Sequence, residues 1–68
     1  MSEDAQIEGI KNGFLTASDV QARKKAFDAL GTFGNKGITA INELIMATGD
    51  PEVKAHGFEI IKKTKEKS

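Results

Sequence analysis

The sequence predicts an all-α fold of four short helices arranged in antiparallel pairs. Apolar residues recur at helical spacing in four separate segments, and glycine-containing turn sequences lie between the later ones. No segment shows the sustained alternation of apolar and polar residues that is typical of a strand. We therefore expect one small helical domain covering residues 1–68.

The first helix is expected over residues 4–15. Its apolar positions follow i, i+3 and i+7 spacing and share one face: Ile7, Ile10 and Phe14. Gly9 and Gly13 each lower the helix propensity by about 1 kcal/mol relative to alanine. This helix is therefore expected to depend on packing against its neighbours.

The second helix is expected over residues 19–30. Ser18 and Gln21 have the spacing of a capping box, and Asp19 adds a negative charge at the positive end of the helix dipole. Gly31 is expected to end the helix as a left-handed C-cap. The following Gly34 and Asn35 predict a turn.

The third and fourth helices are expected over residues 36–47 and 51–63. Asp50 is an N-cap residue, Pro51 occupies the first helical position, and Glu52 places an acid in the first turn. We expect fraying beyond residue 63. The predicted core of all four helices consists of Ile10, Phe14, Phe27, Leu30, Ile41, Leu44, Ile45, Val53, Phe58 and Ile61.

Composition and charge exclude several kinds of protein. There is no cysteine, so disulfides and zinc–thiolate sites are excluded, and no apolar run is long enough to span a membrane. A cytoplasmic location is the default expectation. The net charge is zero, but residues 1–22 carry −3 and residues 54–68 carry +3. Ends of opposite sign favour head-to-tail association, unless both are simply solvated termini.

The chain also aligns with itself when it is shifted by 31 positions. The aligned pairs keep helix starts, small residues and apolar residues in phase: Ile7 with Ile38, Ile10 with Ile41, Phe14 with Ile45, Leu15 with Met46, Asp19 with Asp50, Ala26 with Gly57, Phe27 with Phe58 and Leu30 with Ile61. Such self-similarity indicates an internal repeat.

The repeat resembles a known family. The run Asp50-Pro51-Glu52-Val53-Lys54, with Gly57 and Ile60-Ile61 after it, resembles the first helix of a HEAT-like repeat of the short variety named after phycobilisome lyases. The resemblance implies stacked helix pairs in the order second, first, second and first helix. It also implies a ladder in which Asp19 with Arg23, and Asp50 with Lys54, link neighbouring units. The alternative is that these are independent caps and exposed cations. The chain departs from the family pattern at Gly13, at Gly57 and in the turn after Gly34.

The sequence contains no motif typical of an active site. His56 is the single histidine and falls in the polar phase of its helix, so we expect an exposed side chain without catalytic or metal-binding function. The glycine-rich segment 31–37 lacks the Gly-Lys-Ser/Thr ending of a phosphate-binding loop and is expected to be a turn. We expect no metal and no cofactor.

The sequence therefore predicts a non-catalytic protein–protein interaction module, with a protein partner of unknown identity or a second copy of the chain. The candidate surface consists of exposed positions on the second helices of the repeat: Lys11, Asn12, Asn42, Glu43 and Met46. One alternative is a small subunit or fragment related to phycobilisome lyases. Another is a weak binder of nucleic-acid backbone, which the zero net charge disfavours.

Overall fold

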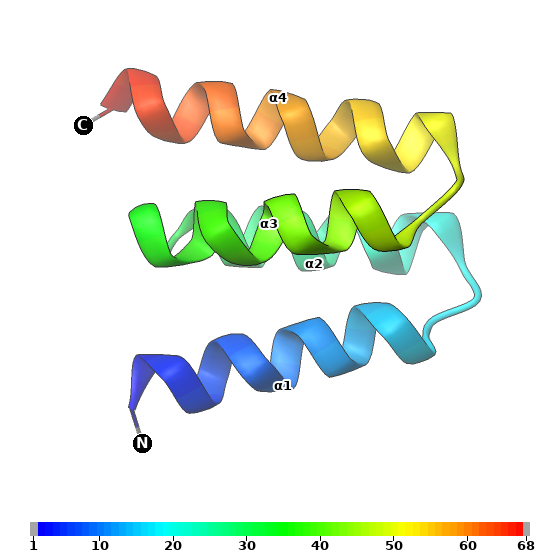
Figure 1. Cartoon of the computed structure of the whole chain (residues 1–68), viewed down its shortest axis with the longest axis horizontal. Helices are drawn as coiled ribbons and strands as arrows, with labels where there is room; N and C mark the ends of the chain where they lie inside the picture. The colour runs from blue at the N-terminus through cyan, green and yellow to red at the C-terminus, as the bar shows by residue number, and fades with distance from the viewer. Residues whose placement is uncertain (1, 68) are drawn as a thin grey trace.

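The computed structural model describes residues 2–67, and these residues form four α-helices joined by short turns (Figure 1). The helices are α1 (Glu3–Thr16), α2 (Val20–Gly31), α3 (Asn35–Ala47) and α4 (Pro51–Lys67). The all-α prediction is confirmed, and no strand occurs within residues 2–67. The expected boundaries agree with these helices except at the end of α4. That helix continues to Lys67, four residues beyond its expected end at residue 63.

The chain runs back and forth, so that helices adjacent in sequence are antiparallel (Figure 1). Helices α2 and α3 contact each other and both outer helices, whereas α1 and α4 make no contact with each other. As a result α1 lies beside α3 and runs parallel to it, and α2 lies beside α4 in the same manner (Figure 1). Two helices thus form the middle of the molecule and two form its edges.

The core lies where the middle helices meet the edge helices. Its residues are mainly aliphatic and expose little or no surface: Ile7, Phe14, Phe27, Leu30, Ala40, Ile41, Leu44, Ile45, Val53 and Ile61. The rings of Phe14 and Phe27 lie 5.0 Å apart between centroids. Gly57 permits α4 to approach, because a Cβ there would lie 2.9 Å from Ile45 and 3.0 Å from Phe27.

The predicted core is wrong at one position. Phe58 is 57% exposed, whereas Ile10 is partly buried and packs against the core. Phe58 belongs to an edge helix, which has neighbours on one side only. The covered side of α4 is occupied by Val53, Gly57 and Ile61, and Phe58 projects beyond it.

The helix starts follow local hydrogen bonding. The Asp50 Oδ1 accepts a hydrogen bond from the Glu52 backbone N–H at 2.9 Å, which confirms the cap expected for α4. The buried Thr48 hydroxyl accepts one from the Asp50 N–H at 3.2 Å and fixes the preceding turn. The capping box expected at Ser18 is wrong. Asp19 is the N-cap of α2, and its side chain accepts no capping hydrogen bond.

The turn between α2 and α3 also differs from expectation. Gly31 is not a left-handed C-cap, because it is the last residue of α2 and Thr32 follows with right-handed helical backbone angles. The positive φ of 67° occurs three residues later, at Gly34, which is the N-cap of α3. A side chain would be strained at that φ, so the turn requires glycine there.

Candidate functional site

An ion pair fixes α1 to α3 on the outer surface of the molecule. The Lys11 Nζ lies 2.5 Å from a carboxylate oxygen of Glu43 on α3 and 3.4 Å from one of Glu8 on its own helix. The hydrogen bond to Glu43 raises the pKa of the Lys11 ammonium above its ordinary value of 10.5, partial desolvation opposes this, and Glu8 adds to the rise. Two of the five predicted surface residues therefore bind each other.

Two large apolar side chains lie one helical turn beyond this ion pair. Leu15 follows Lys11 by four residues and Met46 follows Glu43 by three, so each lies about one helical turn beyond the ion pair on its own helix. Leu15 is 56% exposed and Met46 is 86% exposed. Each of the two helices therefore carries an exposed apolar side chain near the ion pair that joins them.

The remaining predicted surface residues, Asn12 and Asn42, are both exposed on the same two helices. We use the name α1/α3 face for the set Lys11, Asn12, Leu15, Asn42, Glu43 and Met46. Leu15 was missed by the sequence prediction. The 31-residue alignment pairs it with Met46 and would have indicated it.

A shallow groove continues this surface toward the N-terminus of α1. Its volume is about 300 Å³, and most of its lining residues are charged or polar in type: Asp4, Ile7, Glu8, Lys11, Lys36, Thr39, Ala40 and Glu43. The Lys36 Nζ lies 3.4 Å from a carboxylate oxygen of Asp4 and 3.9 Å from one of Glu3, so a second set of ion pairs joins α1 to α3 here. Acidic and basic side chains both line the groove, so neither sign of charge dominates there.

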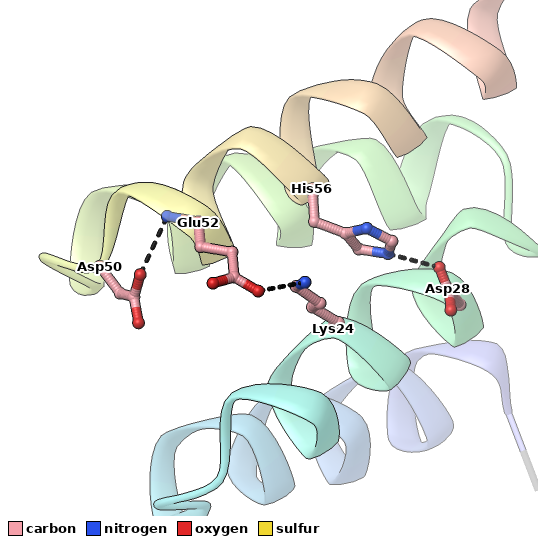
Figure 2. A network of polar contacts seen from close by, with 5 residues as sticks. All are labelled: Lys24, Asp28, Asp50, Glu52 and His56. Carbon is pink, nitrogen blue, oxygen red and sulfur yellow. Dashed lines mark hydrogen bonds and ion pairs between the residues drawn. The ribbon is translucent and has the colours of Figure 1, made fainter.

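A different polar network joins α2 to α4 (Figure 2). Lys24 pairs with Glu52, and one turn further along His56 Nε2 lies 2.8 Å from the Asp28 carboxylate. His56 is half-buried in this contact, so the expectation of a freely exposed histidine is wrong. The sequence could not reveal the contact, because it depends on the packing of two helices that are distant in sequence.

The resemblance implied a ladder of Asp19 with Arg23 and Asp50 with Lys54, but other residues form the ion pairs between α2 and α4. Arg23 Nε donates a hydrogen bond to the Ala17 carbonyl at 2.9 Å, and its guanidinium lies 5.7 Å above the Phe14 ring centroid. Arg23 therefore fastens α1 to α2, and the α2–α4 ion pairs come from Lys24 and Asp28 instead.

A second hollow, of about 450 Å³, lies between the C-terminal ends of α2 and α4. Its rim carries Asp28, Lys63 and Lys67, and the Asp28 carboxylate is already bound to His56. Within residues 2–67 there is no group of three His, Cys, Asp or Glu side chains that could hold a metal ion. No helix in that range is long and apolar enough to cross a membrane.

Comparison of the chain with protein-family models, with curated protein sequences and with solved structures gives no match.

Proposed function

We propose that this protein is a non-catalytic protein–protein interaction module, and that the α1/α3 face binds the partner. The observation that carries the proposal is the exposure of Met46 and Leu15, each about one helical turn beyond the ion pair that joins α1 to α3. Isolated exposed apolar side chains are common on protein surfaces, but an apolar patch with a polar surround is typical of interfaces.

The chemistry of the face suits a protein partner. Burial of a leucine or methionine side chain contributes about 1.5–3 kcal/mol relative to exposure, so the two together can anchor a contact. Asn12 and Asn42 can each donate and accept hydrogen bonds around that anchor. Methionine also adapts its shape to irregular apolar surfaces.

The Lys11–Glu43 ion pair gives this face a defined geometry before a partner arrives. Because the pair joins the two helices that carry Leu15 and Met46, it limits their movement relative to each other. A surface that is already ordered loses less entropy on binding. We infer that the pair acts by holding the apolar anchor in place, more than by contacting the partner.

The helical arrangement supports a HEAT-like unit. The starts of α2 and α4, at Val20 and Pro51, are separated by 31 residues, the same spacing that relates Leu15 to Met46. Helices α1 and α3 lie side by side, as do α2 and α4, which is the two-layer stacking expected of repeated helix pairs. In such stacks one layer of helices commonly provides the binding surface.

The proposal is tested by affinity capture from the cells that produce the protein. The wild-type chain is compared with a double variant, Leu15→Ser with Met46→Ser, and with the matched control Phe58→Ser on α4. All three substituted side chains are large, apolar and exposed, so the variants differ mainly in which face they alter. We expect a protein that is captured by wild type and by the Phe58→Ser variant but is lost from the double variant.

The captured protein is then purified and titrated against the same three chains. A loss of affinity of at least tenfold in the double variant alone supports the proposal. Equal affinity of all three chains contradicts it. If the captured species is instead a nucleic acid or a pigment, the protein belongs to one of the other two functional classes.

A further inference from the structure

The outer side of α4 carries an aromatic side chain that the fold leaves uncovered. Phe58 is 57% exposed, whereas Phe27, its counterpart 31 residues earlier, is completely buried. Phe27 is buried because α2 lies in the middle of the molecule, with helices on more than one side. Helix α4 is an edge helix, so none of residues 2–67 occupies the position that would bury Phe58.

Lysines flank this phenylalanine on the same side of the helix. Lys54 precedes Phe58 by four residues and Lys62 follows it by four, which places all three along one side of α4. We use the name α4 face for these three residues. Neither lysine forms an ion pair with another residue in the range 2–67, in contrast to Lys63, which lies 3.7 Å from Glu59. The α4 face is therefore apolar at its centre and positively charged around it.

The opposite edge of the molecule has complementary properties. Ala5, Gly9 and Gly13 follow one another at four-residue spacing and are all exposed on the outer side of α1. A Cβ placed at Gly9 or Gly13 would meet no atom within 4 Å, so this strip is open. We use the name α1 strip for these three residues. Glu3, Asp4 and Glu8 outnumber Lys11 on the same helix, and their ion pairs with Lys36 and Lys11 place them toward α3.

The internal packing of the chain shows how another helix can lie on such an edge. Helix α3 packs against α1 and α2 through buried residues that include Ala40 and Leu44. The residues 31 positions before them are Gly9 and Gly13. A second molecule that continued the stack would place its α1 on α3 and α4 of the first, as α3 lies on α1 and α2 within one chain. The α1 strip of the second molecule would then face α3 and α4 of the first.

We propose that copies of this chain associate head to tail, with the α1 strip of one copy covering Phe58 on the α4 face of the next. The small side chains of the strip leave room for the phenyl ring. The charges favour the same pairing, because residues 1–22 carry −3 and residues 54–68 carry +3. The two surfaces differ, so the contact is heterologous and extends into open chains or rings of copies, not two-fold dimers.

Two variants test the proposal, each altering one surface. Phe58→Asp removes the aromatic anchor and lowers the positive charge of the α4 face. Gly13→Gln fills the α1 strip, and the open space there allows the monomer to accept the side chain. Thr39→Gln, at an exposed position of α3 outside both surfaces, is the matched control for the added glutamine.

The expected result is specific to head-to-tail contact. At low ionic strength and millimolar concentration, sedimentation velocity should show a series of oligomers for wild type and for Thr39→Gln. The Phe58→Asp and Gly13→Gln variants should each be monomeric alone. Mixed together they should form a one-to-one dimer that grows no further, because only one complementary pair of surfaces remains. At about 1 M salt, where charges are screened beyond about 3 Å, the wild-type association should weaken.

Three results would overturn the proposal. The first is a wild-type chain that stays monomeric at millimolar concentration and low ionic strength. The second is a mixture of the two variants that remains monomeric while wild type associates. The third is binding of a single-stranded oligonucleotide to the wild-type monomer that is lost in the Phe58→Asp variant, which would assign the α4 face to nucleic acid and not to a second copy.

Discussion

The phenyl rings of Phe14 and Phe27 lie 5.0 Å apart between centroids with an angle of 41° between their planes, at the contact between α1 and α2. This tilted arrangement is favourable for aromatic pairs beyond the area that they bury. The Arg23 guanidinium, 5.7 Å above the Phe14 ring centroid, adds a cation–π contact on α2. Since α2 contacts all three other helices, this pair is central to the stability of the domain.

Phe27→Ala is therefore expected to cost about 3–5 kcal/mol in the free energy of unfolding. Natural domains have about 0.05–0.15 kcal/mol of stability per residue, so this loss approaches the entire margin of so short a chain. Phe58→Ala, at the repeat-related but exposed position, should cost less than about 1 kcal/mol. Urea unfolding of the monomeric chains measures both values. Equal costs would contradict the burial described here.

Asp50→Ala is expected to cost about 1 kcal/mol, because it removes the acceptor of the Glu52 N–H at the start of α4. The matched control is Asp19→Ala, at the equivalent position of α2, where the side chain accepts no capping hydrogen bond. Its cost should be limited to the dipole interaction, a few tenths of a kcal/mol. Thermal unfolding of both variants checks the difference, and an unchanged melting temperature for Asp50→Ala would refute the cap.

Gly37→Ala is expected to destabilise the fold by about 3 kcal/mol, the upper end for overpacking, because the added Cβ would lie 1.8 Å from the Leu30 carbonyl oxygen and would push α3 away from α2. Gly13→Ala adds the same methyl group in open space. It should raise the free energy of unfolding by about 0.5–1 kcal/mol through helix propensity. Denaturant unfolding of the pair distinguishes these opposite signs. A destabilised Gly13→Ala variant would show that the strip is not open.

The Lys11–Glu43 ion pair predicts a pH-dependent contribution to stability at alkaline pH. Because the folded state raises the pKa of Lys11 above 10.5, the contribution is complete below 10.5 and is lost as the pH rises through the folded-state pKa. The difference in unfolding free energy between wild type and Lys11→Met should thus shrink above that pH. The matched control is the same substitution in a Glu43→Gln background, where the partner of Lys11 is removed and the change should be smaller. A constant difference for Lys11→Met would contradict the pairing.

The sequence predicted the four helices because each carries an apolar face at helical period and most carry clear boundary residues. It did not predict that Phe58 would be exposed. Periodicity indicates which side of a helix is apolar, but not whether a neighbouring helix exists to cover it. The His56–Asp28 contact was missed for a related reason, since its two residues are brought together only by the packing of α4 on α2. For the candidate site, the sequence predicted that Asn12, Asn42 and Met46 occupy exposed positions but missed Leu15, because an exposed leucine near a cross-helix ion pair is evident only once α1 and α3 are packed together.

The most direct test of partner binding at the α1/α3 face is site-specific photo-crosslinking in the producing cells. A photoreactive amino acid is placed at Met46 in one chain and at Gln21, an exposed position of α2, in another. The proposed function predicts a crosslinked adduct with a distinct protein from position 46 and none of that adduct from position 21. The same adducts from both positions, or none from position 46 while the chain is abundant, would contradict it.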